Sequence, residues 1–465
     1  MKLKQIYTKC LAQGTYFIAS EGVGAVIDPL REIDAYLDEA EANGVQIKYI
    51  FETHFHADFV SGHVSLAEKT GAKIVFGPKA TTQFEAEVAE DGQVYEIGKL
   101  KLKVLHTPGH TPESTSFLLY DEEGKEHALF SGDTLFIGDV GRPDLAVKSD
   151  LTQEDLAGML YDSLRNKIMP LSDEVLVYPA HGAGSACGKN MSSETFDTLG
   201  NQKKVNYALQ PMDKQEFISK VTEGLSTPPQ YFPENVRLNK EGYESTASVL
   251  DRSEHALSVE DFQKAKDKGA LILDTRSPQV FNKAFVPGSI NIGLRGQFAS
   301  WVGALILDMQ QPMVLITEAG DEQEAITRLS RVGYDQVVGF LDGGIDAWQK
   351  TGQAVDVIKS IPAEILEKEL SKGIAVIDAR RPSEYQAEHI NDEQVKNYPL
   401  DQVHEHELNH EKTYYIHCAG GYRSMIMASI LKQKGYSVVD VTGGFKAIKE
   451  TNIPLTNYVC PSTLE

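Results

Sequence analysis

The C-terminal half of the chain contains an internal repeat, and this repeat constrains the fold more than any other feature. Residues 271–276 match residues 375–380, residues 314–320 match 414–420, and residues 341–345 match 441–445. In each copy, short apolar runs typical of buried strands alternate with helical stretches. This alternation predicts a doubly wound parallel sheet, so we expect two such domains, at 257–355 and 356–465.

The two copies differ at one position that matters for chemistry. Cys418 follows an apolar run in the second copy, whereas Glu318 stands at the matching position of the first. Cys418 is followed by Gly420, Gly421, Arg423 and a helical stretch. Glycines let backbone N–H groups turn inward and a helix N-terminus adds positive partial charge, so this loop favours a thiolate or a bound persulfide. Arg423 can pair with an anionic acceptor or brace the loop.

The motifs around Cys418 belong together as a set. They are Asp378 and Arg380, Glu384, His389 with Ile390, the six-residue loop 418–423, and Gly443 with Gly444. With them the second copy resembles the rhodanese family of sulfurtransferases over roughly 358–456, and the first copy resembles it more loosely. The resemblance implies that Cys418 takes sulfur as a persulfide and passes it to a thiophilic acceptor.

The same resemblance assigns further roles in the two copies. It implies that Arg423 is part of the catalytic loop and that substrate binds along Ala419, Gly420, Gly421 and Tyr422. The domain at 356–465 is therefore expected to be an active rhodanese domain. The domain at 257–355 lacks the cysteine and the arginine, so we expect an inactive rhodanese-like domain with a structural or docking role.

Candidate metal ligands follow strand-like runs in the first part of the chain. His54, His110, Asp133 and His181 each fall just beyond a short apolar run. A rigid sheet holds loops at its strand ends in place, so this arrangement favours a functional site over chance. We expect a layered α/β domain at 1–205.

The spacing of these residues favours a metal site. His54, His56 and Asp58 lie at one-residue intervals, so a tight loop can aim alternate side chains at one point. Imidazole and carboxylate together suit zinc, iron or manganese.

Four motifs carry a second family resemblance: residues 53–58, 107–111, 131–134 and 178–182. On these motifs the first domain resembles the metallo-β-lactamase superfold, which implies an αββα sandwich. The commonest form of the first motif has a histidine directly after the aspartate, where it helps to hold a second metal. This chain has Phe59 there, and phenylalanine cannot bind a metal, so a dinuclear hydrolytic centre loses one ligand.

Within this fold, residues 53–58 and 141–144 resemble those of the persulfide dioxygenases more closely. That resemblance implies one mononuclear non-haem Fe(II) held by His54, His110 and Asp133, with open positions for a persulfide sulfur and dioxygen. The residues implied to surround these ligands and orient them are His56, Asp58 and His181. With Phe59 present, that side of the iron should be more apolar than in typical members.

Three further side chains are candidates near this site. Arg142 is expected either to bind the substrate's carboxylates or persulfide or to form a surface salt bridge. Tyr178, which shares a motif with His181, is a candidate for substrate binding. Cys187 follows that motif, and both a redox or sulfur-relay role and a plain buried thiol stay open, because exposure and pKa decide thiol reactivity.

Residues 206–256 separate the first domain from the repeat. Prolines punctuate a polar sequence there, which indicates a linker. We expect this linker to pack on the first domain through Tyr231 and Phe232.

Charge and composition exclude several classes of partner. With 67 acidic and 45 basic side chains, the formal charge of −22 repels phosphate backbones and anionic headgroups, so neither nucleic acid nor membrane is an expected partner. No apolar run approaches the roughly 18–20 residues of a spanning helix, and the first residues lack the apolar core of a signal peptide. The four cysteines form no CxxC pair and fit a reducing compartment, so a cytoplasmic protein is expected.

Together the two sites predict an α/β multidomain enzyme of sulfide oxidation. We expect iron-dependent oxidation of a low-molecular-weight thiol persulfide by dioxygen to sulfite. Cys418, loaded by another persulfide, would then convert sulfite to thiosulfate. The activities are those of a persulfide dioxygenase and a thiosulfate sulfurtransferase.

Two alternatives stay open. One is a zinc-dependent thioesterase of the glyoxalase II type with an accessory sulfurtransferase, and the other is a sulfur carrier or scaffold with a vestigial metal site. The sequence does not name the thiol carrier, whether glutathione, coenzyme A or bacillithiol. Paired domains and a long linker favour a homo-oligomer.

Overall fold

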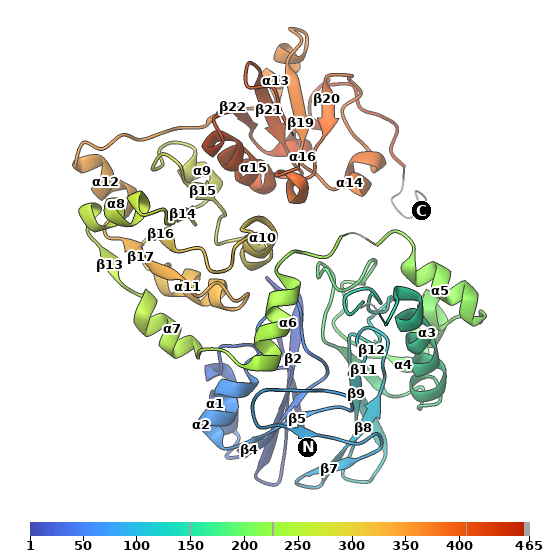
Figure 1. Ribbon diagram of the computed structural model, residues 1–465. Coiled ribbons are helices and arrows are strands. Elements are labelled where there is room, and N and C mark those ends of the chain that lie inside the picture. Colours follow the sequence, from blue (N-terminus) through green and yellow to red (C-terminus); the bar gives the residue numbers. More distant parts are fainter. Residues whose placement is uncertain (148–149, 226, 406, 460–465) are drawn as a thin grey trace. The chain divides into compact units, whose positions relative to one another are not determined.

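The computed structural model describes residues 1–147, 150–225, 227–405 and 407–459 of the chain (Figure 1). Two compact units make up the chain. Unit 1 comprises residues 1–249 with the short segment 330–333, and unit 2 comprises residues 250–329 and those from 334 onward. The last six residues of the expected C-terminal domain lie outside the described residues.

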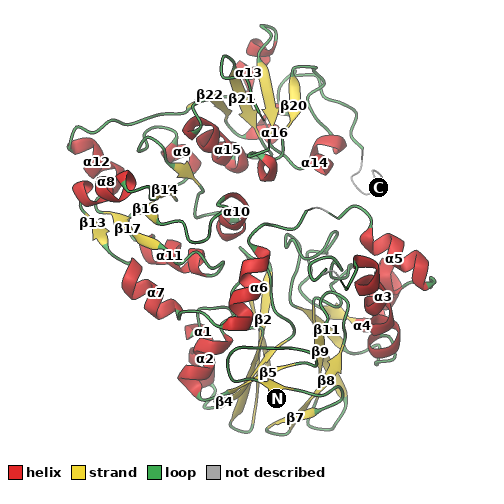
Figure 2. Ribbon diagram, viewed as in Figure 1, coloured by secondary structure: helices red, strands yellow, loops and turns green. Residues whose placement is uncertain are grey.

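Unit 1 is built on two six-stranded sheets (Figure 2). In spatial order, the first sheet contains β1 (Lys2–Thr8), β2 (Gln13–Ser20), β3 (Val23–Ile27), β4 (Gln46–Glu52), β5 (Lys73–Phe76) and β6 (Glu87–Val88). The second sheet contains β12 (Asp197–Thr198), β11 (Leu176–Pro179), β10 (Glu126–Gly132), β9 (Thr115–Tyr120), β8 (Leu100–His106) and β7 (Val94–Ile97).

Helices cover the outer face of each sheet (Figure 1). Those on the first sheet are α1 (Asp34–Ala42), α2 (His63–Thr70) and α6 (Phe232–Glu241). Those on the second are α3 (Gln153–Ser163), which continues into a π-helical turn (Leu164–Ile168), α4 (Leu199–Val205) and α5 (Lys214–Thr222).

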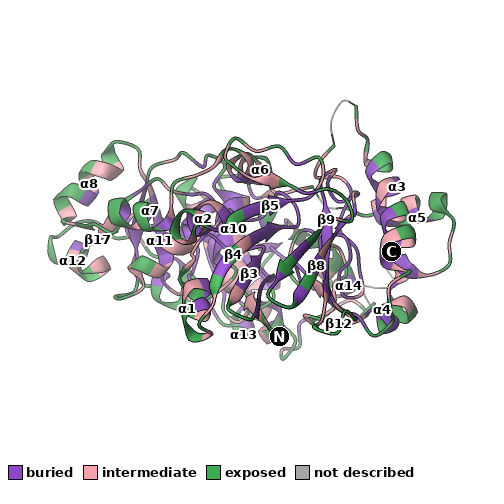
Figure 3. Ribbon diagram, turned by 90° about the horizontal axis from the view of Figure 1, so that it is seen from below, coloured by how far each residue is buried: buried purple, intermediate pink, exposed green. Residues whose placement is uncertain are grey.

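Alternation of side chains along the strands explains this layering. In β2, Tyr16 and Ile18 join the core between the sheets, whereas Phe17 and Ala19 join the core under the helices. Strands buried on both faces read as continuous apolar runs, and β3, β4 and β5 are largely buried (Figure 3). The αββα sandwich predicted from the sequence is confirmed.

The segment predicted as a linker contains regular structure. It includes a 3₁₀ turn (Tyr207–Leu209), helices α5 and α6, and α7 (Thr246–Ser253). Pro233 lies in the first turn of α6. Backbone N–H groups in the first turn have no partner within the helix, so the N–H that proline lacks costs no helical hydrogen bond. Tyr231 and Phe232 are buried, and the Tyr231 hydroxyl donates to the Asp58 carbonyl at 3.3 Å.

Unit 2 contains two five-stranded sheets in which every strand pair is parallel among the described residues. The first sheet, in order, is β13 (Ala256–Leu257), β17 (Val337–Leu341), β16 (Met313–Ile316), β14 (Leu271–Asp274) and β15 (Ile290–Asn291). The second is β18 (Lys359–Ile361), β22 (Ser437–Val441), β21 (Thr413–His417), β19 (Ala375–Asp378) and β20 (Val395–Asn397). The two predicted parallel α/β domains are confirmed.

Helices connect these parallel strands. The first copy has α8 (Val259–Asp267), α9 (Pro278–Phe281), α10 (Phe298–Leu305), α11 (Glu322–Ser330) and α12 (Gly344–Lys350). The second has α13 (Ala363–Leu370), α14 (Pro382–Ala387), a 3₁₀ turn (Leu400–Gln402), α15 (Tyr422–Gln433) and α16 (Gly444–Ile448). Among the described residues, none of the helices combines the length and the apolar character needed to cross a bilayer.

The core between the two sheets of unit 1 should respond strongly to truncation. Phe117 is fully buried, and its ring centroid lies 5.0 Å from that of Phe51 on the opposite sheet. We expect Phe117→Ala to lower the free energy of unfolding of unit 1 by about 3–5 kcal/mol, measured by urea unfolding with far-UV circular dichroism.

Two controls are built into the chain. Phe196→Ala removes a ring that is 49% exposed, so we expect a change of about 0.5 kcal/mol or less. Both tryptophans, Trp301 and Trp348, lie in unit 2, so the fluorescence transition should not move. An unchanged dichroism transition in Phe117→Ala would contradict the proposed packing.

Candidate functional site

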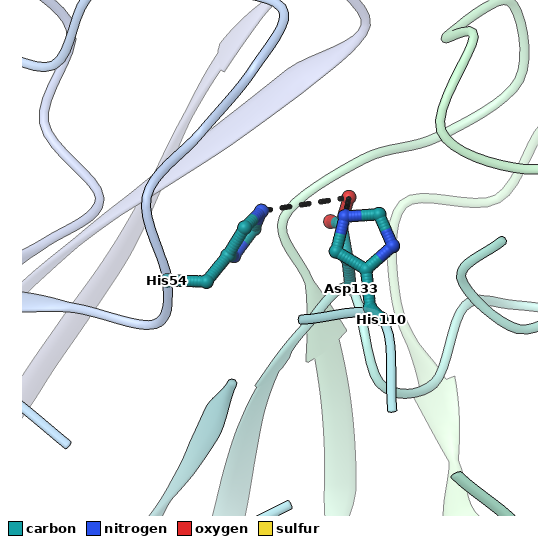
Figure 4. Close-up of side chains that lie close together, drawn as sticks. All are labelled: His54, His110 and Asp133. Atoms are coloured by element: carbon teal, nitrogen blue, oxygen red, sulfur yellow. Dashed lines mark ion pairs between the residues drawn. The ribbon is translucent and has the colours of Figure 1, made fainter. Parts of the chain in front are cut away.

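Three predicted ligands converge at the end of the two sheets in unit 1 (Figure 4). His54 follows β4, His110 follows β8 and Asp133 follows β10, and all three are buried. One ligand atom from each lies within 4.8 Å of the others. Asp133 Oδ2 lies 3.4 Å from His110 Nε2 and 3.8 Å from His54 Nε2. This geometry brings two nitrogens and one oxygen around a common point.

Hydrogen bonds on the far side of each ligand fix its orientation. His110 Nδ1 donates to the Arg142 carbonyl at 2.9 Å, which leaves Nε2 with its lone pair. Thr53 donates its hydroxyl proton to Asp28 Oδ2 at 2.9 Å, so its oxygen accepts from His54 Nδ1 at 3.0 Å. Each ring therefore presents Nε2 toward Asp133, as metal-binding histidines do.

The charge states also suit a cation. Burial lowers the pKa of His54 well below its ordinary value and lowers that of His110, so both imidazoles are neutral. Burial alone would raise the pKa of Asp133, but His181 and the other histidines hold it below its ordinary value. Asp133 Oδ2 is buried and accepts no hydrogen bond from the described residues. A buried carboxylate oxygen of this kind is stabilised by a positive ion.

A second group of three lies beside the first. His56, Asp58 and His181 also bring one ligand atom each within 4.8 Å of one another. His181 links the two groups, because Nδ1 donates to Asp133 Oδ1 at 2.8 Å and Nε2 lies 3.0 Å from Asp58 Oδ2. Burial would lower the pKa of His181, but the two carboxylates raise it well above its ordinary value. The Phe59 ring lies 4.3 Å from the His56 ring, so this side carries an apolar surface.

Arg142 organises the site rather than facing the surface. The side chain is buried and pairs through two nitrogens with Asp144, at 2.6 and 2.7 Å. Its Nη1 donates to the Ala186 carbonyl and its backbone N–H to the Cys187 carbonyl. The ion pair is thus internal, not the surface salt bridge considered from the sequence, and contact with substrate stays a prediction.

Cys187 lies next to the metal-ligand candidates. Its sulfur lies within 4.8 Å of ligand atoms of Asp133 and His181. Burial, and then the carboxylates of Asp58 and Asp133, raise the pKa of this thiol well above its ordinary value. The resting group is therefore a protonated thiol, and a redox or relay role stays a prediction.

Tyr178 lies on β11, with its ring among other aromatic rings. Its centroid is 5.3 Å from that of Tyr16, 5.9 Å from that of Phe130 and 5.4 Å from that of Phe196. These contacts explain the position of the ring by packing, and substrate binding by Tyr178 stays a prediction.

The sequence interpretation missed buried acids beneath the ligands. Asp28 accepts from the Thr53 N–H at 2.8 Å, and its Oδ1 lies 3.2 Å from His56 Nε2. Glu52 lies 3.0 Å from His63 Nδ1, and both side chains are buried. Asp28 directly follows β3, so the rule that located His54 and Asp133 would also have found it.

The predicted thiolate loop of unit 2 lies between β21 and α15. The Gly421 N–H donates to Cys418 Sγ at 3.1 Å, which is the inward-turned backbone donor predicted from the glycines. Cys418 is buried, whereas Ala419 and Gly420 are exposed. A Cβ on Gly444 would lie 2.3 Å from the Cys418 carbonyl oxygen, so only glycine allows this close approach.

Arg423 and Tyr422 brace this loop from two sides. Arg423 binds both carboxylate oxygens of Glu384, at 2.6 and 2.8 Å. The Tyr422 hydroxyl donates to the Gly293 carbonyl of the first copy at 2.7 Å, and substrate contact by Tyr422 stays a prediction. A Cβ on Gly296 would lie 2.5 Å from the Tyr422 ring. The side chain therefore docks on the neighbouring copy.

The matching loop of the first copy is filled by its own side chains. Glu318 stands in place of the cysteine, and the Glu322 carboxylate accepts from the Gly320 N–H at 2.8 Å and from the Thr317 hydroxyl at 3.2 Å. A fixed carboxylate thus occupies loop donors, and no thiol is present. That this copy is catalytically silent stays a prediction.

Comparisons with known proteins match both halves of the chain to known protein families. The Metallo-beta-lactamase superfamily matches residues 9–181, and the Rhodanese-like domain matches residues 258–351 and 362–451. Human mitochondrial persulfide dioxygenase ETHE1 is 30% identical over 233 residues, covering 49% of this chain and 82% of the relative. Hydroxyacylglutathione hydrolase GloC of Haemophilus influenzae is 26% identical over 194 residues, covering 37% of this chain and 86% of the relative. The crystal structure of a metallo-beta-lactamase from Staphylococcus aureus subsp. aureus COL is 31% identical, with a TM-score of 0.65, and covers 73% of this chain and 98% of that one.

Metal content provides a direct check of the ligand set. We expect His110→Ala to abolish stoichiometric metal binding, because one of three ligands is lost. We expect Thr53→Val, which removes only the hydroxyl beneath His54, to weaken metal affinity about 10–100-fold. The measurements are elemental analysis of the purified protein and competition with a chelator.

His106→Ala is the matched control. His106 lies four residues from His110, but its Nε2 contacts the Pro112 carbonyl at 3.0 Å, and it belongs to no ligand group among the described residues. Its metal content should equal that of the unmodified protein. Equal losses in His106→Ala and His110→Ala would refute the assignment.

Proposed function

Because this chain belongs to the family of the persulfide dioxygenase ETHE1 within the metallo-β-lactamase superfamily and also carries two rhodanese-like domains, we propose that it converts thiol persulfides to thiosulfate. The observation that carries this proposal is the buried set of His54, His110 and Asp133, on one chain with a cysteine that accepts a backbone hydrogen bond. One site suits oxidation of a persulfide, and the other suits transfer of its sulfur.

The donor set fits a single ferrous ion. Two neutral imidazoles and one carboxylate are the ligands of many non-haem iron oxygenases, and three protein ligands leave positions for other molecules. Phe59 supports one ion rather than two, because it offers no ligand atom beside His56. Iron(II), when bound, would supply the activation of dioxygen that oxidation of the outer sulfur requires.

The residues of the chain hold and shape this site. Thr53 and the Arg142 carbonyl orient the two imidazoles, and His181 holds the second oxygen of Asp133. The buried Phe59 ring lies against His56 and keeps water away from that side of the ligand set. Each turnover consumes one dioxygen and one water per persulfide, and yields the free thiol, sulfite and two protons.

The thiolate loop would consume the sulfite. Cys418 takes the outer sulfur of a second persulfide, so one S–S bond forms as the donor S–S bond breaks and a free thiol leaves. The persulfide on Cys418 then gives this sulfur to sulfite, which becomes thiosulfate as the cysteine is regenerated. Carrying both sites on one chain raises the effective concentration of sulfite near the transfer domain.

A hydrolase is the second candidate function. The group of His56, Asp58 and His181 favours it, because these residues have the composition of a second metal site. The similarity to hydroxyacylglutathione hydrolases points the same way. A zinc-dependent thioesterase would need the second ion that Phe59 disfavours.

Oxygen consumption tests the primary proposal. With glutathione persulfide as the probe, anaerobically purified, iron-loaded protein should consume oxygen and form thiosulfate. We expect Cys418→Ser to retain oxygen uptake and to accumulate sulfite in place of thiosulfate, measured by oxygen electrode and ion chromatography. Hydrolysis of S-lactoylglutathione by a two-zinc protein without oxygen uptake would establish the hydrolase instead.

Position 59 distinguishes one ion from two. We expect Phe59→His to complete the second group and raise the zinc bound per chain from about one to about two, by elemental analysis. Phe59→Leu is the matched control, because it keeps the position apolar and should leave the metal content unchanged. Two zinc ions in the unmodified protein would argue against the mononuclear site.

A further inference from the structure

Cys418 lies at the start of a buried chain of hydrogen bonds. Its Sγ lies 3.7 Å from the hydroxyl of Ser424, in the first turn of α15. The Ser424 hydroxyl donates to Asp440 Oδ1 at 2.8 Å, from the neighbouring strand β22. All three side chains are buried. A nucleophile, a hydroxyl and a carboxylate are thus connected without an intervening water.

The surroundings of Asp440 leave it able to accept a proton. Its second oxygen accepts from the Ser360 hydroxyl on β18 at 3.1 Å, and its register partner on β21 is the apolar Ile416. Among the described residues, no cation lies within ion-pair distance of Asp440. Burial therefore raises its pKa to about 6, although the hydrogen bonds from Ser424 and Ser360 act in the opposite direction.

The first copy of the repeat serves as an internal control. Its matching strand and helix, β17 and α11, place Phe340 where Asp440 stands and Glu324 where Ser424 stands. The cysteine itself is replaced by Glu318. Cysteine, serine and aspartate therefore occur together in one copy and are all absent from the other. Packing alone does not require this, since both copies fold with the same strand order.

We propose that Ser424 and Asp440 relay the proton of the Cys418 thiol during sulfur transfer. Ser424 touches the reacting sulfur, and Asp440 acts through Ser424 as a positioning residue and proton acceptor. This inference rests on the sulfur transfer proposed above and adds the route of the proton.

The transfer step balances without an oxidant. The S–H bond of Cys418 breaks as its sulfur attacks the outer sulfur of the donor R–S–SH, so that a new S–S bond forms. The S–S bond of the donor breaks, and RS⁻ leaves with the electron pair. The proton passes through Ser424 to Asp440 and then to RS⁻, giving a Cys418 persulfide and R–SH.

The relay also prevents a build-up of negative charge. A thiolate beside an ionised, buried Asp440 would place two like charges in a region of low dielectric. Moving the proton onto Asp440 neutralises the carboxylate as the sulfur gains charge. The Gly421 N–H, 3.1 Å from the sulfur, then stabilises the remaining anion.

The test is single-turnover loading of Cys418 in the full-length protein over about pH 5 to 9. Thiosulfate is the donor, because its charge does not change in this range, and the transferred sulfur is released by cyanide and measured as thiocyanate. In the unmodified protein the loading rate should rise with pH along a limb centred near the Asp440 pKa of about 6.

Asp440→Asn keeps the shape but cannot take the proton. We expect its loading rate on the plateau above this limb to fall about 10²-fold, and the limb near the Asp440 pKa to disappear. Ser424→Ala should behave in the same way, whereas Ser424→Thr, which restores a hydroxyl, should recover most of the rate. The serine variants keep the test decisive if Asp440→Asn fails to fold, and far-UV circular dichroism monitors the folding of each variant.

Ser360→Ala is the matched control. Ser360 donates to Asp440 but has no hydrogen bond to Cys418 among the described contacts. Its hydrogen bond lowers the pKa of Asp440, so its loss should move the limb to higher pH while the rate on the plateau stays unchanged.

The outcomes separate this inference from the function on which it rests. Loading in Cys418→Ala at the rate of the unmodified protein, or no loading of the unmodified protein, would overturn the proposed sulfur transfer. If Cys418 is loaded but Asp440→Asn and Ser424→Ala keep the rate and the pH profile, the relay is wrong and the transfer stands.

Discussion

The buried carboxylate of Asp28, which exchanges water for hydrogen bonds from Thr53 on folding, determines the orientation of the candidate metal ligand His54. Asp28 receives two hydrogen bonds from Thr53, one from the backbone and one from the hydroxyl. Because that hydroxyl gives its proton to Asp28, its oxygen is left to accept from His54. A buried, unpaired charge costs several kcal/mol, so this chain of contacts depends on the sheets that hold β3 and β4 side by side. The orientation of the His54 ring therefore depends on the pairing of β3 with β4.

The sequence predicted those ligands that follow strands but not the residues beneath them. His54, His110 and Asp133 stand in recognisable motifs after apolar runs, and the fold brings them together. Asp28 follows a similar run, so the same rule would have selected it, but no local pattern shows that it supports His54. Its partner Thr53 is 25 residues away, and only strand pairing joins the two. Local pattern thus selects candidate residues at strand ends, and tertiary structure shows which of them face the site and which support the ligands.

Two other features went beyond the sequence predictions. Prolines in residues 206–256 indicated a linker, and this segment contains helix α6 with Pro233 in its first turn, where a helix tolerates proline. Tyr422 lies in the predicted thiolate loop, and the sequence did not predict the direction of its side chain. Its direction is set by Gly293 and Gly296 of the other copy, which leave room for the ring, and no pattern within the loop contains that information. The placement of the Cys418 loop thus includes a contact made by the first copy.

The two copies of the repeat share one fold but differ in where a negatively charged group lies in the loop. In the first copy, the Glu322 carboxylate accepts from the Gly320 N–H, so a carboxylate already occupies the loop. In the second copy, the Gly421 N–H donates to Cys418 Sγ, and the Ser424 hydroxyl connects this sulfur to the Asp440 carboxylate. The first loop thus contains a carboxylate. The second loop contains a sulfur that becomes charged when the Cys418 thiol loses its proton. The sulfur transfer proposed for Cys418 needs the second arrangement, because the same loop would hold a thiol, a thiolate and a persulfide in turn.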